Sequence, residues 1–107
     1  MSITFKDFEK LSLKVGRITK ADRISGLSKI IKVEVDIGDR KAQAIAGGAQ
    51  YYDPSTLLGK RVIVVTNMEP KTIAGVRSEV MLLAADVNGK PVWLTVEEEV
   101  PIGTTVR

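Results

Sequence analysis

The sequence contains no cysteine and no histidine among its 107 residues. The absence of cysteine excludes disulfide bonds, thiolate zinc sites and cysteine nucleophiles. The absence of histidine removes the commonest general base and metal ligand at neutral pH. The carboxylates show neither a paired spacing typical of acid–base catalysis nor a cluster that suggests a metal site. We therefore expect a protein that is not an enzyme and that needs no metal or cofactor.

Long apolar runs are also missing. The longest are of the kind seen at Val62–Val65, which is far too short to cross a bilayer. The first ten residues lack the apolar region of a secretion signal. We therefore expect a cytoplasmic protein that does not contact a membrane. A chain of this length provides a single hydrophobic core, so residues 1–107 are expected to form one domain.

The charges are nearly balanced, with 16 lysine and arginine residues against 13 aspartate and glutamate residues. Their distribution is uneven, because Glu97, Glu98 and Glu99 form one acidic run near the C-terminal end. The rest of the chain is correspondingly more basic than the net charge of +3 indicates. A basic body with a separate acidic segment suits an anionic partner such as a nucleic acid.

The N-terminal segment predicts a short helix. Thr4 can cap it, Asp7 occupies the third helical position, and Phe5, Phe8 and Leu11 recur at helical spacing. The two phenylalanines on such a peripheral helix must be buried against something. Either the domain's own strands or another subunit can supply that contact.

Apolar residues then alternate with polar ones and predict three consecutive strands. The first strand begins at Leu13, and its apolar register slips at Gly16, as a bulge or a sharp coil of the strand would produce. Residues 29–37 alternate cleanly, and a glycine–aspartate turn leads into residues 40–47, where small alanines occupy one face. The spacing and the turn chemistry predict a hairpin.

The second half of the chain begins with a miniature helix at residues 53–59. Asp53 is its N-cap, and Gly59 is placed for the left-handed position after its end. The remaining segments are predicted as a strand buried on both faces at 60–67, a polar loop at 68–79, and two strands at 80–87 and 91–96 joined by a type I′ turn at Asn88-Gly89.

This order predicts a mainly β OB-fold, a five-stranded barrel with a short helix between strands three and four. The N-terminal helix and a C-terminal strand are additions to the barrel. Several short strands are also compatible with an SH3-like barrel, but the capped helix after the third strand favours the OB-fold. OB barrels bind oligonucleotides or oligosaccharides on the face of strands two and three and on the adjoining loops.

Two stretches of sequence resemble a known family. The first is Leu11–Ile18 (LSLKVGRI), and the second is Asn67–Ala85, which contains NMEPK, then Gly75, then SEVMLLAA. Together with YYDP at 51–54 and the ending PIGTTVR, they make essentially the whole chain resemble the structure-specific tRNA-binding domain family. This OB-fold module is appended to methionyl-tRNA synthetases or acts beside them. The resemblance implies tRNA as the partner.

Two branches of this family remain open. Ser78-Glu79-Val80 after Ala74-Gly75 looks more like a sister branch described as protein-export chaperones. The tyrosine pair, Asn67 and LAA at 83–85 look more like the synthetase branch, which we favour. The resemblance thus implies a non-catalytic, structure-specific tRNA-binding module that acts in trans with methionyl-tRNA synthetase or as its β subunit. The alternative is a chaperone-like protein that binds unfolded polypeptides.

Nine residues are candidate contacts to RNA. The amide of Asn67 can pair with a base edge or brace the loop backbone. The resemblance places Ser78 and Met81 on the tRNA surface, where a hydroxyl can bind phosphate or ribose and a thioether can pack against a base. Met81 can equally belong to the core. The other six candidates are cations that could form one phosphate-binding surface if the first and fourth strands are neighbours: Lys14, Arg17, Lys60, Arg61, Lys71 and Arg77.

Aromatic residues are scarce, and none of the five falls on the second or third predicted strand. Proteins that bind single strands on an OB barrel generally present stacking aromatics there. The pattern therefore favours recognition of a folded RNA shape through its backbone.

We also predict a homodimer. Phe5 and Phe8 lie on a helix outside the barrel, and Val92, Trp93 and Leu94 lie in a segment beyond its last strand. Neither group has an obvious destination within the chain, and chains that resemble this one pair through such additions. The competing interpretation is that the helix and the tail cap the open ends of their own barrel.

Overall fold

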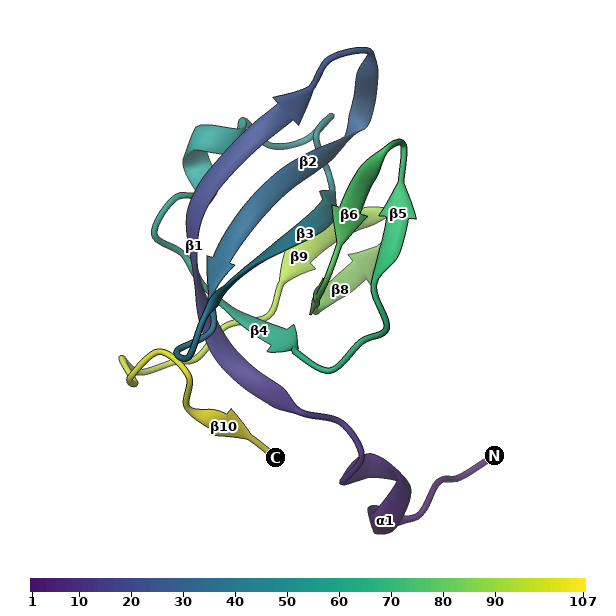
Figure 1. Cartoon of the computed structure of the whole chain (residues 1–107), viewed down its shortest axis with the longest axis vertical. Helices are drawn as coiled ribbons and strands as arrows, with labels where there is room; N and C mark the ends of the chain where they lie inside the picture. The colour runs from purple at the N-terminus through teal and green to yellow at the C-terminus, as the bar shows by residue number, and fades with distance from the viewer.

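One antiparallel sheet that curls into a nearly closed barrel forms the body of the protein in the computed structural model, which describes residues 1–107 (Figure 1). The strands lie in the order β3-β2-β1-β4-β7, and the short 3₁₀ helix η1 connects β3 to β4. This arrangement confirms the predicted OB-fold order. The elements are β1 (Leu13–Ile24), β2 (Leu27–Asp36), β3 (Lys41–Gly47), η1 (Pro54–Leu57), β4 (Arg61–Val65) and β7 (Met81–Leu82).

The barrel interior combines branched side chains on β2 with alanines on β3. Val33 lies opposite Ala44 and Val35 opposite Ala42, and all four side chains are at most 1% exposed. Small residues opposite large ones let the sheet curl tightly enough to close. All four residues of Val62–Val65 on β4 are buried, as predicted for a strand covered on both faces.

Gly16 does not mark a bulge, which was one of the two causes considered for the slip in the sequence. It pairs regularly with Val62, and the register shift in β1 lies two residues later, between Ile18 and Lys20. A Cβ atom at Gly16 would lie only 2.7 Å from Cγ2 of Val35 and 2.9 Å from Cγ2 of Val64. A glycine inside a strand can indicate either a bulge or a close approach, and here it permits a close approach across the core.

The predicted polar loop at 68–79 contains a hairpin instead, formed by β5 (Lys71–Ile73) and β6 (Val76–Ser78). Its turn residues Ala74 and Gly75 have φ values of +51° and +80°. The turn was missed because alanine rarely adopts a positive φ.

The apolar segment 80–87 is divided between two sheets. β7 continues the barrel, whereas β8 (Ala84–Val87) pairs with β9 (Lys90–Trp93) in a separate hairpin. Asn88 and Gly89 both have positive φ, which fits the type I′ turn predicted there.

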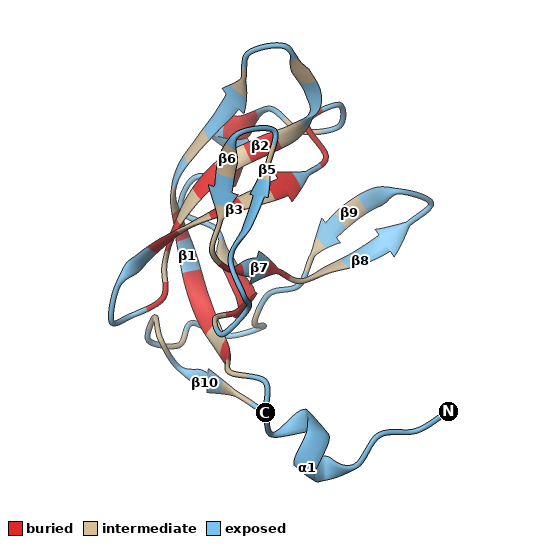
Figure 2. Ribbon diagram, turned by 45° about the vertical axis from the view of Figure 1, so that its right-hand side comes forward, coloured by how far each residue is buried: buried red, intermediate tan, exposed pale blue.

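The helix α1 (Phe5–Phe8) stands away from the barrel (Figures 1 and 2). Its predicted cap is present, because Oγ1 of Thr4 accepts a hydrogen bond of 3.1 Å from the backbone N–H of Asp7. No residue of α1 is buried, and Phe5 is 88% exposed. The interpretation that the helix packs on its own barrel is therefore wrong.

The C-terminal end returns to the barrel. β10 (Thr105–Val106) pairs with β1 at Leu13 and Lys14. Trp93 lies on β9, within the strand predicted at 91–96 and beyond β7, the last strand of the barrel. It packs against the core and lies 6.4 Å from Tyr52 between ring centroids. Trp93 thus has a destination within the chain. No helix has the length and apolar character needed to span a membrane.

Candidate functional site

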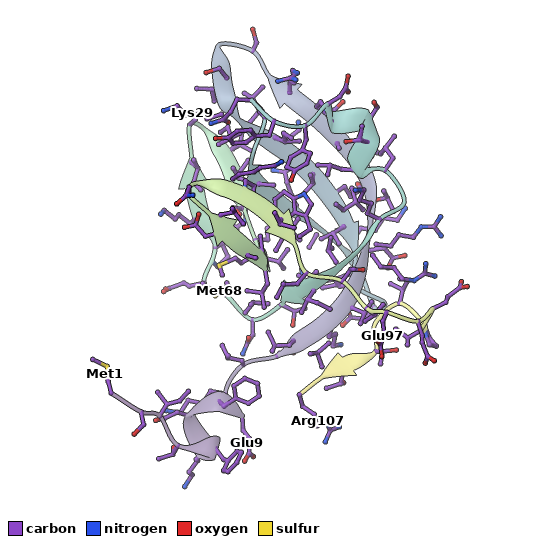
Figure 3. The ribbon with its side chains drawn as sticks, turned by 180° about the vertical axis from the view of Figure 1, so that it is seen from behind. Met1, Glu9, Lys29, Met68, Glu97 and Arg107 are labelled. Atoms are coloured by element: carbon purple, nitrogen blue, oxygen red, sulfur yellow. The ribbon has the colours of Figure 1, made fainter.

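The structure divides the six predicted cations into two groups on different parts of the barrel. The first group comprises Lys14, Arg17, Lys60 and Arg61, on or beside β1 and β4; the second comprises Lys71 and Arg77 on the β5–β6 hairpin. In Figure 3, Met68, which precedes the hairpin in sequence, lies on one side of the barrel, and Glu97 of the acidic run, whose Glu99 pairs with Arg61, lies on the other. The cations therefore do not form the single surface expected from the sequence.

Within the first group, Arg17 and Arg61 lie directly opposite each other on β1 and β4. Lys14 is three residues before Arg17 on the same strand, so the two side chains point to opposite faces of the sheet. Lys14 shares its face with Val64, which belongs to the interior core. The expected slip at Gly16 would have brought Lys14 and Arg17 together, but that slip is absent.

Arg61 is also partly neutralised. Its Nη2 atom lies 3.0 Å from Oε1 of Glu99 in the acidic run, and its side chain is only 27% exposed. Arg61 and Lys60 line a hollow with Tyr52 and Trp93. Arg17 and Lys60 are exposed and form no ion pair with an acidic side chain, so they are the more available cations of this group.

The β5–β6 hairpin, which carries the second group, borders a hollow of about 300 Å³ together with β3 and β7, hereafter the hairpin hollow. Three of the predicted contacts, Lys71, Ser78 and Met81, line it together. Met81 is 45% exposed, whereas its neighbours Val80 and Leu82 are buried. The core interpretation of Met81 is therefore excluded. The full lining is Ile45, Met68, Glu69, Lys71, Ile73, Ser78, Val80 and Met81.

Sequence reasoning did not assign Met68 and Glu69 to a site, although both stand within the NMEPK motif. Ile45 and Ile73 were missed for a different reason. Ile45 comes from β3, and Ile73 lies in a segment expected to be an irregular loop. Only the folded hairpin brings these side chains to one hollow.

Ser78 holds the wall of the hairpin hollow in place. Its Oγ atom accepts a hydrogen bond of 3.2 Å from the N–H of Ile45 and donates one of 3.3 Å to the carbonyl of Val80. Beside it, the N–H of Glu79 donates to the carbonyl of Gln43, and the Glu79 carboxylate accepts from the N–H of Gln43. The side chains of Ser78 and Glu79 thus accept hydrogen bonds from backbone N–H groups of β3 and join this strand to the segment before β7, which closes the barrel.

Arg77 is close to this closure as well. Its Nε atom lies 3.9 Å from Oε2 of Glu79, a long ion pair that leaves most of the guanidinium in solvent. Its backbone carbonyl accepts a hydrogen bond of 2.8 Å from the side-chain amide of Gln43. The backbone of Arg77 therefore helps to close the barrel, while its guanidinium remains on the surface.

Asn67 braces the backbone, which is one of the two roles considered for its amide. Its Oδ1 atom accepts a hydrogen bond of 2.9 Å from the N–H of Ser12, and its Nδ2 atom donates one of 2.7 Å to the carbonyl of Lys10. These bonds attach the segment after α1 to the end of β4. Asn67 thereby fixes where the N-terminal helix leaves the barrel.

The only clear pKa shift belongs to a residue outside both cation groups. The pKa of Asp53 is lowered by hydrogen bonds from the backbone N–H and the hydroxyl of Ser55, and the positive charge of Arg23 lowers it further. This is the electrostatic signature of an N-cap rather than of a reacting group.

The site as a whole offers cations and an apolar hollow, which suit binding of an anionic ligand.

Comparisons with known proteins agree with this chemistry. A family model described as "Putative tRNA binding domain" matches residues 13–105. The methionine–tRNA ligase of Methanothrix thermoacetophila is 47% identical over 105 residues, which cover 98% of this chain and 16% of that protein. The chain thus spans about one sixth of the length of that curated relative.

Two solved structures share the fold over nearly their whole length. A MetRS related protein from Pyrococcus horikoshii superposes with a TM-score of 0.93 at 37% identity and covers 100% of this chain and 99% of its own. The chaperone CsaA from Bacillus anthracis superposes with a TM-score of 0.90 at 32% identity and covers 100% of both chains.

Proposed function

Since the chain belongs to the tRNA-binding domain family, we propose that it is a non-catalytic module that binds the folded shape of tRNA with the hairpin hollow at the centre of its contact surface. The observation that carries this proposal is that Lys71, Ser78 and Met81 line one hollow. A cation beside an apolar recess can bind a phosphate and cover the adjoining sugar or base. No aromatic side chain lines it, so it lacks the stacking platform of proteins that bind extended single strands, which favours a folded RNA as the ligand.

The cations supply the electrostatic part of this binding. Lys71 contacts the RNA beside the hollow, and Arg17 and Lys60 extend the phosphate contacts along β1 and β4. Each contact releases condensed counterions from the RNA, so affinity depends steeply on salt. Ser78 and Asn67 support the surface by positioning the hairpin and the N-terminal segment.

We propose methionyl-tRNA synthetase as the catalytic partner. The similarity to methionine–tRNA ligases supports this assignment. The module would act in trans with the enzyme or as its β subunit, in the cytoplasm, and would raise the local concentration of tRNA near the catalytic site.

We also propose that the working unit is a homodimer. Ile3, Phe5 and Phe8 line an open apolar recess on and beside α1 that no other part of the chain covers. A two-fold pair would cover this recess twice and double the cationic surface. Val92 and Leu94, which are exposed on and after β9, are the other proposed contacts, and Trp93 supports them from the core.

A titration with an unmodified tRNA transcript over a range of salt concentrations tests the binding. If about four to six phosphates are contacted, log K falls with log salt at a slope of about −3 to −5. Lys71→Ala and Arg17→Ala should weaken binding to all tRNAs alike and reduce the slope by about 1 each. Lys29→Ala is the matched control, because Lys29 is an exposed lysine on β2 outside both groups. A slope near zero, or equal binding to a short unstructured oligonucleotide, would contradict the proposal.

The second candidate function is that of a chaperone for unfolded polypeptides. The similarity to the chaperone CsaA and the exposed apolar face of α1 support it. An unfolded protein that displaces tRNA, or whose aggregation the chain suppresses at stoichiometric concentration, would favour this function over the first.

A further inference from the structure

We propose that the hairpin hollow receives one unpaired guanine of the bound RNA and that Glu69 recognises the Watson–Crick edge of that base. The inference rests on the proposed function and adds base selectivity to it. It assigns a role to Glu69, an acidic residue at the centre of a surface expected to bind an anion.

The lining of the hollow suits the faces of a nucleobase. Five of its eight residues are apolar, and two of them, Met68 and Met81, are exposed. The flexible, polarizable thioether of methionine packs well against an aromatic ring. The branched side chains of Ile45 and Ile73 complete the apolar lining. A hollow of about 300 Å³ has room for one base that has left its stack.

The carboxylate of Glu69 is free to bind a ligand. It forms no hydrogen bond and no ion pair within the protein, and its side chain is exposed. Glu79, by contrast, uses its carboxylate to close the barrel. The carboxylate of Glu69 is therefore the one that remains available at the hairpin hollow.

A carboxylate selects guanine because it can only accept hydrogen bonds. The Watson–Crick edge of guanine offers two adjacent donors, N1–H and the N2 amino group. Adenine and cytosine offer one donor beside an acceptor, and uracil offers one donor between two acceptors. Those acceptors would face the carboxylate without a proton between them. Only guanine therefore satisfies both oxygens at once.

Lys71 and Glu69 then have separate roles at the hollow. Lys71 binds a phosphate next to the inserted base and contributes affinity for any sequence, whereas Glu69 contributes discrimination. The base must be unpaired, because in a duplex cytosine occupies the same two donors. The ligand is thus a folded RNA that presents a single unstacked guanine beside a structured backbone.

Four RNA hairpins that differ only in one looped-out nucleotide test the inference on the full chain. The wild-type protein should bind the guanine hairpin about ten-fold more tightly than the other three, since one bidentate contact gives discrimination of this order. Glu69→Gln should reduce the preference to about two-fold or less, because an amide presents one donor and one acceptor. Glu98→Gln removes the same charge at an exposed position without an ion pair and should leave the preference unchanged.

A second variant separates base insertion from a purely electrostatic effect. Met81→Ser should weaken binding of all four hairpins several-fold, because it removes packing against the base without removing a cation. Its exposed position on β7 makes it compatible with the folded barrel.

The outcomes distinguish this inference from the function on which it rests. Equal binding of the four hairpins by the wild type, or an unchanged preference in Glu69→Gln, overturns the guanine assignment while binding of tRNA stands. Loss of binding to tRNA itself overturns both. An unfolded polypeptide could also displace the guanine hairpin from the wild type but not from Met81→Ser. That result would assign the hollow to peptide side chains and overturn the inference as well.

Discussion

The carboxylate of Glu99 lies 3.0 Å from a terminal guanidinium nitrogen of Arg61, across 38 positions of sequence. The acidic run near the C-terminal end is thereby placed beside Arg17 and Arg61, which face each other on β1 and β4. An RNA phosphate that approaches Arg61 must compete with this carboxylate. The tail therefore lowers the electrostatic attraction of this part of the barrel.

Replacing Glu99 by glutamine should raise the affinity for tRNA at low salt. The gain should be a few-fold at most, because an ion pair with one exposed partner contributes about 0–1 kcal/mol. Filter binding at low and at moderate salt measures it, and the gain should shrink as salt increases. Glu98→Gln makes the same change in net charge, so an equal gain in that variant would show that the contact to Arg61 has no part in the effect.

Replacing both Phe5 and Phe8 by serine should dissociate the proposed dimer without unfolding the barrel. No residue of α1 is buried within the chain, so these substitutions remove no intramolecular packing of the core. Sedimentation equilibrium at micromolar concentration should give about twice 11.6 kDa for the wild type and 11.6 kDa for the variant.

Leu58→Ser is the matched control for this experiment, because Leu58 is an equally apolar, exposed residue after η1. A wild-type mass near 11.6 kDa would contradict the dimer. If the wild type is a dimer, its melting temperature should rise with protein concentration, because assembly and folding are linked.

Gly16→Ala should destabilise the barrel. The new Cβ would lie 2.7 Å from Val35 and 2.9 Å from Val64, both in the packed core, and 3.1 Å from the carbonyl oxygen of Asp36. Overpacking of this kind costs about 1–3 kcal/mol of the free energy of unfolding. Urea denaturation measures the loss. Gly47→Ala is the control, since a Cβ there meets nothing within 4 Å, and its stability should stay close to that of the wild type.

Acid should weaken the start of η1 through Asp53. The folded-state pKa of Asp53 lies below its ordinary value of 3.8, chiefly because the N–H of Ser55 donates to its carboxylate. A lowered folded-state pKa gives a stabilising contribution that is complete above the unfolded-state pKa and is lost as pH falls through the folded-state value. Asparagine also caps helices but does not titrate in this range.

The stability of the wild type relative to Asp53→Asn should therefore be constant above about pH 5 and should fall below about pH 4. Thermal denaturation of both proteins between pH 2 and pH 7 provides the comparison. A difference that is the same across this range would show that the interaction with Ser55 does not depend on the charge of Asp53.

Local signals account for most of the fold that could be predicted. The alternation of Ile31, Val33 and Val35 identified a strand, because side chains of a strand point to opposite faces in turn. Asn88-Gly89 identified its hairpin because both residues tolerate a positive φ. Thr4 identified the start of α1 because its hydroxyl accepts from a backbone N–H only three residues away.

The candidate site was predicted only in part. Lys71, Ser78 and Met81 were proposed together and do line one hollow. Ser78, however, proves to direct its hydroxyl to the backbone of Ile45, 33 residues away, and no pattern within either segment indicates that contact. Glu69 carried no sequence signal of its own, because its availability depends on the absence of a partner in the folded protein.

The sequence by itself determined what is local: the positions of most strands, caps and turns, the absence of histidine and cysteine side chains, and the motifs that it shares with a family. The tertiary structure decided which charges remain available. It separated the cations on or beside β1 and β4 from those on the β5–β6 hairpin, brought Glu99 to Arg61, and used Asn67 to anchor the N-terminal segment. The reason is physical, because secondary structure depends on neighbours a few positions apart, whereas charge pairing and barrel closure depend on residues that meet only when the sheet closes.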